Sequence, residues 1–175
     1  MQESGIQVSL FGKYPLSSEY LHIGESSSFT NSILSWIQAG YEALLKKRQK
    51  YVRDRIHHLY FSNREGASCV YATLRLSKDS KGREYPLIVL VEVSPSNEEK
   101  MYDTLWRKNL EVFQGIHTLE KLESTLEQYQ LEGIAEGNLR ELDEGVLATF
   151  VSEDFSKSKH FYRSLQVDDF IEMMR

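Results

Sequence analysis

The side chains best able to do chemistry in this 175-residue chain are a carboxylate and a guanidinium four residues apart. Asp79 and Arg83 flank Gly82 within a polar stretch, where they could form a charge-assisted hydrogen bond across a turn. Asp side chains also accept hydrogen bonds from nearby backbone amides in turns. Two interpretations follow: the pair braces the turn, or the turn presents the pair to a ligand or partner.

The other reactive side chains form no catalytic or metal-binding pattern. Cys69 is the only cysteine, and its place in an apolar run favours a buried structural thiol over a nucleophile. His57 and His58 are adjacent, and neighbours on a helix point about 100° apart, so they cannot clasp one metal ion. We expect both to be surface or half-buried histidines. Glycine-rich nucleotide loops and a nucleophile elbow are missing, so we predict no catalytic residues, cofactor or metal.

Two apolar runs must position the Asp79 loop. Residues 69–76 and 85–93 are rich in β-branched and aromatic side chains, and a polar loop containing Gly82 separates them. This pattern predicts a β-hairpin with a longer loop, in which Gly82 supplies a positive φ. We expect the rest of the chain to pack on this hairpin.

Periodicity predicts the other elements. Alternation predicts a strand at 6–11, and apolar residues at helical spacing predict helices at 29–47, 51–61, 102–113, 118–129 and 167–174, while 146–151 fits strand or helix. The order predicts an α/β (α+β) layered fold with a mostly antiparallel central sheet. Gly40 within the first helix suggests close packing on another element. We expect helix ends to be marked by an N-cap at Ser28, a capping box at Ser96 and Glu99, a stop at Gly115 and a cap at Thr118. We also expect Trp36 and Trp106 to lie in the core.

Composition limits the class of protein. The length suits one domain, residues 1–175, and 41% hydrophobic with 27% charged residues is near the globular average. No apolar run is long enough for a membrane span, no secretory signal is visible, and a single cysteine favours a reduced, cytoplasmic setting. The net charge of −5 argues against a nucleic-acid binder. We expect the basic run at 46–55 and the acidic run at 120–154 to be solvated, or else a partner surface.

Three short motifs, in order, resemble the TagF family, also called ImpM, of bacterial type VI secretion systems. Residues 77–87 match its Ser-x-Asp-x-x-Gly-Arg signature followed by Pro-Leu. Residues 11–15, Phe-Gly-Lys-Tyr-Pro, are similar to its opening Gly-Lys-Leu-Pro, and residues 36–38 fall where the family has a Trp-Leu-Gln helix. The chain looks like a divergent member, because Glu84 stands where the family has an aromatic and residues 18–20 replace its Gly-Asp-Phe.

The resemblance implies a longin-like layered sandwich with helices on both faces of the sheet. It also implies a non-enzymatic accessory protein that represses type VI secretion post-translationally by binding a protein, the forkhead-associated scaffold of the system. Both loop motifs would then meet at one sheet end and form the partner-binding site: Gly12, Lys13, Asp79, Gly82 and Arg83. The alternatives are a longin-like adaptor for a small GTPase, and a small hydrolase that uses Cys69 or a histidine.

Overall fold

The computed structural model describes residues 5–15, 17–63, 67–94, 100–114, 118–129, 139–142 and 144–175. Seven strands within these ranges form one antiparallel sheet in the order β2-β1-β5-β4-β3-β8-β9. They are β1 (Gly5–Gly12), β2 (Leu21–Gly24), β3 (His57–Asn63), β4 (Ser68–Lys78), β5 (Glu84–Ser94), β8 (Ala148–Val151) and β9 (Ser158–Phe161). A separate antiparallel pair joins β6 (Lys100–Tyr102) to β7 (Leu139–Glu141).

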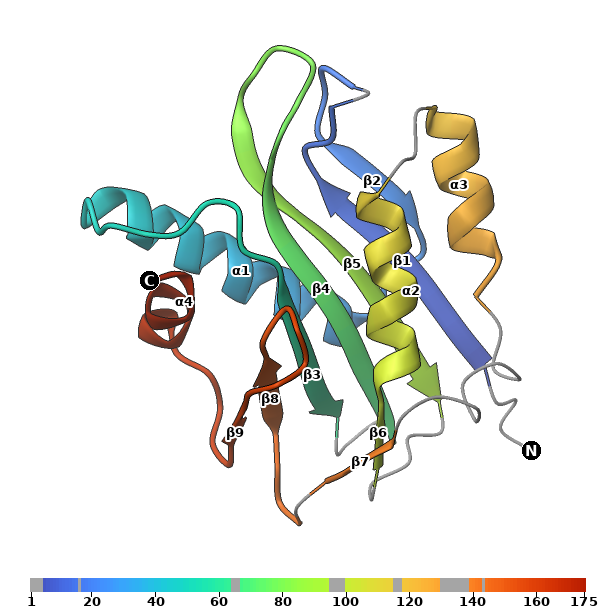
Figure 1. The fold of residues 1–175 in the computed structure, drawn as a ribbon, viewed down its shortest axis with the longest axis vertical. Helices are drawn as coiled ribbons and strands as arrows, with labels where there is room; N and C mark the ends of the chain where they lie inside the picture. The colour runs from blue at the N-terminus through green and yellow to red at the C-terminus, as the bar shows by residue number, and fades with distance from the viewer. Residues whose placement is uncertain are drawn as a thin grey trace.

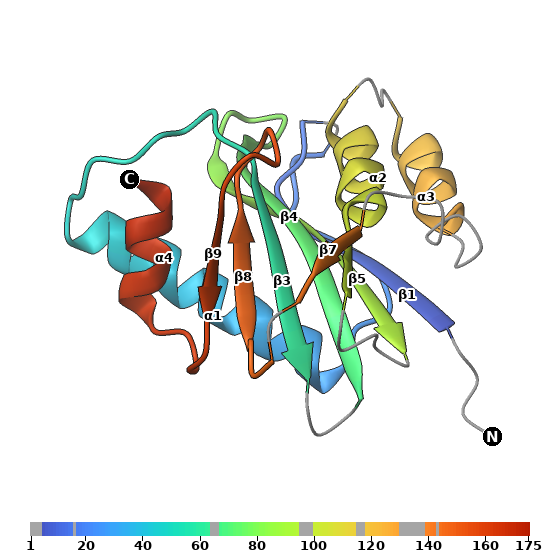
Figure 2. The same ribbon diagram turned by 60° about the horizontal axis from the view of Figure 1, so that its bottom comes forward.

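Helices cover both faces of the sheet. The helices are α1 (Ser28–Lys46), α2 (Asp103–Phe113), α3 (Leu119–Glu127) and α4 (Val167–Met174). In Figure 1, α2 crosses in front of the sheet and α1 passes behind it. One apolar core lies between the sheet and α2 with α3, and the other between the sheet and α1 with α4. Figure 2 shows the same layers from another side. The predicted α+β class and antiparallel sheet are confirmed.

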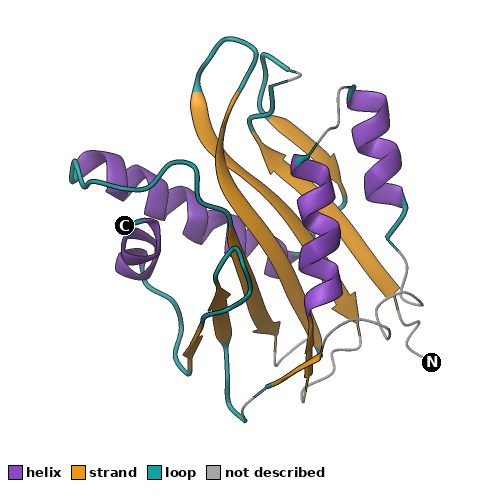
Figure 3. Cartoon of the chain, viewed as in Figure 1, coloured by secondary structure: helices purple, strands orange, loops and turns teal. Residues whose placement is uncertain are grey.

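The predicted hairpin forms the centre of the sheet. β4 and β5 pair from Cys69 opposite Val93 to Lys78 opposite Glu84, and their tip projects beyond the neighbouring strands (Figure 3). Side chains of β5 alternate between the two cores, since Val89 packs beneath α2 and Ile88 beneath α1. A strand buried on both faces needs apolar residues at every position, which explains the continuous apolar run.

The helix predicted at 51–61 is wrong. Its second half is β3, which pairs with β4 on one edge and β8 on the other. Ile56, Leu59 and Tyr60 fit a helical period only because the whole run from 56 to 61 is buried. A fully buried run of this length carries no periodicity that separates strand from helix.

The remaining predictions are largely confirmed. The helices at 29–47, 102–113 and 167–174 are present, Thr118 caps α3, and 148–151 is a strand. Ser27, not Ser28, caps α1, because its hydroxyl accepts from the Thr30 amide. Ser96, Glu99, Gly115 and most of 131–144 lie outside the described residues. None of the helices that the structure describes is both long and apolar enough to cross a bilayer.

Candidate functional site

Two loops meet at one end of the sheet, and one of them is the tip of the β4–β5 hairpin (Figure 3). One follows β1 and comprises residues 12–15 with 17–18, and the other joins β4 to β5 and comprises residues 79–83; together we call them the loop pair. The Ser80 amide donates to the Ser17 carbonyl at 2.8 Å, and the Arg83 guanidinium donates to the Ser18 carbonyl. Lys13 Nζ lies 3.9 Å from Asp79 Oδ2. The fold thus brings the two sequence motifs into contact.

Asp79 is the centre of the loop pair. Its Oδ1 accepts from the Lys81 and Arg83 amides, both at 2.9 Å, and its Oδ2 accepts from Arg83 Nε at 2.7 Å. The Gly82 amide closes the turn by donating to the Asp79 carbonyl at 3.0 Å. Gly82 has a φ of +80°, the left-handed conformation that glycine adopts most easily. The turn therefore depends on the carboxylate at 79 and the glycine at 82.

The surroundings of Asp79 favour its charged form. Burial raises the pKa of this carboxyl, but the hydrogen bonds from the Arg83 backbone and side chain and from the Lys81 amide outweigh it, so the pKa lies below its ordinary value. The carboxylate itself is enclosed, while the Arg83 side chain is 54% exposed. Asp79 is thus a bracing residue, and Arg83 both braces the turn and faces solvent.

The five predicted site residues differ in their exposure to solvent. Gly12 and Asp79 are buried, Lys13 is half-buried, and Gly82 and Arg83 are exposed. Gly12 has a φ of +124°, and a Cβ there would lie 2.1 Å from the Pro86 carbonyl oxygen. Glycine at this position is therefore required by the close approach of β1 to β5.

The groups of the loop pair that a partner could contact are its exposed cations. Lys81 and Arg83 are exposed, and Lys13 lies between Asp79 and the ring of Tyr85, whose centroid is 6.0 Å from Nζ. A partner that approaches this end of the sheet meets two exposed positive charges on a turn whose shape is held from within.

Glu84, beside the loop pair, was not singled out as a site residue from the sequence. Its Oε1 accepts from the Tyr41 and Tyr51 hydroxyls at 3.1 and 3.0 Å, and its Oε2 accepts from Arg53 Nε at 3.2 Å. Burial and the nearby Glu84 charge raise the pKa of Tyr41. These bonds tie α1 and the segment before β3 to the loop end of the hairpin. The sequence did contain one sign of this role, because Glu84 stands where the TagF family has an aromatic residue.

The two adjacent histidines are buried, which corrects the expectation that they lie at or near the surface. Neighbours on a strand point to opposite faces, and both faces of β3 are covered. Burial lowers the pKa of His57 to about 4, with a smaller contribution from the charge of Arg55. His57 is therefore neutral at physiological pH.

His58 belongs to a buried chain of polar side chains beneath α2 and α3. Its Nδ1 lies 3.0 Å from the Thr73 hydroxyl, and Asn109 Nδ2 donates to the same hydroxyl oxygen at 3.1 Å. The Tyr129 hydroxyl in turn donates to Asn109 Oδ1 at 2.8 Å. These four residues, the polar chain, lie on three separate elements and a loop, so only the tertiary fold joins them. Sequence periodicity gave no sign of it.

Cys69 is buried as predicted. Burial raises the pKa of its thiol to about 12, so the thiol stays protonated at neutral pH. Among the residues that the structure describes, no three His, Cys, Asp or Glu side chains gather closely enough to hold a metal ion.

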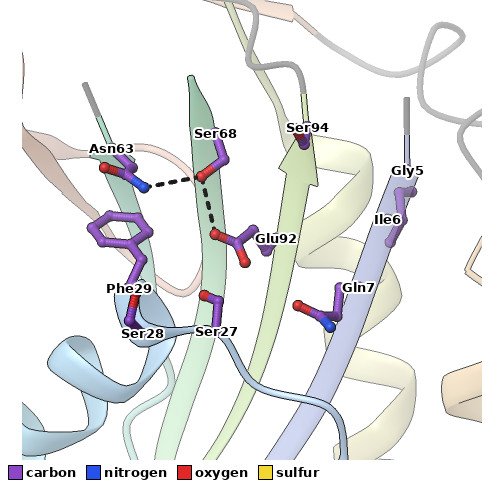
Figure 4. A pocket seen from close by; sticks show the side chains of 10 residues that line it. All are labelled: Gly5, Ile6, Gln7, Ser27, Ser28, Phe29, Asn63, Ser68, Glu92 and Ser94. Atoms are coloured by element: carbon purple, nitrogen blue, oxygen red, sulfur yellow. Dashed lines mark hydrogen bonds between the residues drawn. The ribbon is translucent and has the colours of Figure 1, made fainter. Parts of the chain in front are cut away.

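Two further surface pockets lie away from the loop pair. A pocket of about 360 Å³ lies at the start of α1 and the ends of β1, β4 and β5 (Figure 4). Its polar side chains bond one another, with Asn63 donating to Ser68 and Ser68 to Glu92 at 3.0 Å. Another, of about 280 Å³, adjoins half-buried Trp36, whose indole donates to the Gln166 carbonyl at 2.8 Å.

Comparison with known proteins gives a family and a fold. The model of the TagF N-terminal domain, described as type VI secretion system-associated, matches residues 9–135. The chain is also similar to the protein PA0076 of Pseudomonas aeruginosa PAO1, known from a crystal structure, with a TM-score of 0.69 at 13% identity. The similarity covers 95% of this chain and 93% of that one, and at this identity it shows a shared fold. No curated protein matches the sequence.

Proposed function

The chain belongs to the TagF N-terminal domain family, which is associated with type VI secretion, and from this premise we propose that it is a non-enzymatic repressor of a bacterial type VI secretion system. It acts by binding another protein after translation. The partner that the family resemblance implies is the forkhead-associated scaffold of the apparatus, in the cytoplasm.

The observation that carries this proposal is the loop pair. Its turn is braced by four hydrogen bonds to Asp79 atoms from Lys81, Gly82 and Arg83. A loop that already holds one shape loses little conformational entropy on binding. Its exposed cations, Lys81 and Arg83, suit a partner surface of negative potential.

The burial of Cys69 favours a binding role over a hydrolase that would use this thiol. Cys69, the best candidate nucleophile in the sequence, is 2% exposed and has a pKa of about 12. A protonated thiol enclosed between sheet and helices cannot reach a substrate without rearrangement of the core.

The test is capture of partners by the tagged, full-length chain in its native host, followed by mass spectrometry. We expect a forkhead-associated protein or another secretion component among the captured proteins. Lys81→Glu reverses a charge at the exposed tip and spares the bracing bonds, since only the Lys81 backbone takes part in them. We expect it to reduce capture at an unchanged melting temperature, while Lys157→Glu, at an exposed position in the connection from β8 to β9, leaves capture unchanged.

Arg83→Ala separates bracing from recognition. Arg163→Ala is its matched control, because Arg163 also pairs with an aspartate, Asp169, at 2.8 Å, but away from the loop pair. Loss of capture beyond what Arg163→Ala causes, at equal melting temperature, supports recognition by Arg83. Recovery of no secretion component by the wild-type chain, in a host that expresses the apparatus, would show the proposed function to be wrong.

A further inference from the structure

Arg75, on β4, is a cation without a counter-charge in the described part of the chain. Its Nε is buried and has no hydrogen-bond partner there, and no ion pair joins it to a carboxylate. The guanidinium lies over the Phe113 ring, 5.0 Å from its centroid. A guanidinium without a counter-charge can pair with an anion that comes from outside the chain.

Arg75 lines a surface pocket of about 430 Å³ next to the loop pair. Four other charged residues line it, namely Arg53, Asp54, Lys78 and Glu84. Arg53 and Glu84 neutralise each other through the 3.2 Å bond between Nε and Oε2. The remaining lining charges are those of Arg75, Lys78 and Asp54, which sum to one positive charge. The pocket therefore suits a single anionic group.

The pocket lies along a strand edge that is open in the described structure. β3 begins at His57, opposite Leu74, so residues 75–78 of β4 pair with β5 alone. Leu76 is opposite Pro86, which has no N–H and cannot form the doubly hydrogen-bonded kind of pair. The backbone N–H and C=O of Leu76 therefore point toward the open edge. An extended segment could hydrogen-bond there as an added strand.

The segment that reaches this edge through Arg53 and Asp54 is rich in basic residues. The segment 46–55 leads from α1 to β3, and six exposed cations within it are Lys46, Lys47, Arg48, Lys50, Arg53 and Arg55. Two of them have a carboxylate partner, since Lys47 pairs with Asp168 and Arg53 with Glu84. The net positive charge of the pocket lining, together with the basic segment that leads to it, favours an acidic segment and disfavours a basic one.

We propose that the pocket at the open edge of β4 binds an extended, acidic segment of a partner protein, with one carboxylate or phosphate group of that segment held by Arg75. The segment adds to β4 through backbone bonds at Leu76, and its anionic side chain supplies the counter-charge that the Arg75 guanidinium lacks. Planar guanidinium groups bind both kinds of anion through paired hydrogen bonds. This inference rests on the proposed function, since it names the chemistry by which the partner is recognised.

The direct test follows the Arg75 Nε–H resonance by NMR in the full-length chain during titration with inorganic phosphate. Sodium chloride keeps the ionic strength constant, and the resonance is assigned by its loss in Arg75→Gln. We expect a saturable shift of Nε–H, and a change of the backbone amides of 75–78 at the same midpoint. An Nε–H resonance that does not respond to phosphate would overturn the proposal.

Three variants make the titration specific. Arg75→Gln should weaken phosphate binding roughly tenfold or more, because it removes a charge-assisted hydrogen bond. Asp54→Asn should strengthen binding, because it removes the one uncompensated lining carboxylate. Arg107→Gln is the matched control, since Arg107 also lies over an aromatic ring, 4.4 Å from the Phe155 centroid, but does not line this pocket. Equal phosphate binding by wild type and Arg75→Gln would overturn the proposal.

A parallel titration with acetate distinguishes the two sources of the anion. Tighter binding of phosphate indicates a phosphorylated side chain, and equal or tighter binding of acetate indicates aspartate or glutamate. Either result supports an anion site at Arg75.

Capture experiments separate this inference from the proposed function. If the wild type and Arg75→Gln, both folded, capture a secretion component equally, the proposed function stands and the role of the pocket in recognition is wrong. If the wild type captures none, the proposed function is wrong, and the phosphate titration still reports whether the pocket binds anions.

Discussion

The two faces of the sheet are filled by different chemistry. Beneath α1 and α4 the buried side chains are mostly aliphatic and aromatic, and the close approach of the helices is set by Gly40 against Phe170. Beneath α2 and α3 the core also contains the polar chain and Trp106, whose indole donates to the Leu59 carbonyl at 2.9 Å. The face beneath α2 and α3 thus contains a connected chain of buried polar side chains in addition to its apolar packing.

This difference has a consequence for function. Packing of apolar side chains tolerates a range of aliphatic sequences, whereas a buried polar chain demands a particular partner at each position. The polar face also carries Arg75, which rests on Phe113 at the end of α2. The proposed anion pocket therefore adjoins the face that contains the polar chain.

The largest loss of stability is expected at Gly40, where α1 packs directly on α4. A Cβ at Gly40 would lie 2.4 Å from Phe170 Cγ, inside the ring contact between α1 and α4. Gly40→Val should therefore lower the free energy of unfolding by about 3 kcal/mol or more, because the overpacked helices must separate. Urea denaturation followed by circular dichroism measures this change.

A neighbouring position provides the control for Gly40. Ala39 is exposed on the same helix, so Ala39→Val should change the free energy of unfolding by less than about 1 kcal/mol. Combining Gly40→Val with Phe170→Leu should recover part of the loss, because the smaller side chain makes room. Equal effects at 39 and 40 would contradict the packing argument.

His57 is a buried titratable residue on the face beneath α1 and α4, and it predicts a pH dependence. Its pKa is about 4 in the folded chain and 6.5 in the unfolded chain, and its Nε2 is buried without a partner in the described structure. As pH falls from 6.5 to 4, the unfolded chain binds a proton that the folded chain does not. Stability should therefore fall by about 3 kcal/mol across this window.

Replacement of His57 separates its contribution to the pH dependence from that of carboxylates that titrate in the same pH range. In His57→Leu the difference in unfolding free energy from wild type should grow in favour of the variant as pH falls from 6.5 to 4. His22→Gln, at an exposed position, is the control. A wild-type curve parallel to that of His57→Leu would show that His57 is not held neutral.

A smaller effect is expected from the polar chain. Asn109→Leu leaves the Tyr129 hydroxyl and the Thr73 hydroxyl without the amide between them, so we expect a loss of about 2 kcal/mol. Thermal unfolding measures it, with Asn31→Leu at an exposed position of α1 as the control. Adding Tyr129→Phe to Asn109→Leu should restore stability in part, because no hydroxyl then remains unpaired. No restoration would indicate that Asn109 acts by packing alone.

The sequence by itself determined those features that depend on neighbours along the chain. The hairpin at 69–93, α1, α2 and α4 follow from local periodicity, and the turn chemistry of Asp79 and Gly82 follows from their spacing. The short motifs at 11–15 and 77–87 also sufficed to indicate the family that the comparison confirms. Local hydrogen bonds and amphipathic patterns are encoded within a few residues of each other, which is why they could be predicted.

Only the tertiary structure decided the features that depend on burial. The segment 56–61 became a strand because β4 and β8 lie on either side of it, and the histidines at its start are buried for the same reason. The enclosure of Asp79 and the open edge at Arg75 depend on where other strands begin and end. These properties come from contacts between residues far apart in the chain, so no local pattern could carry them.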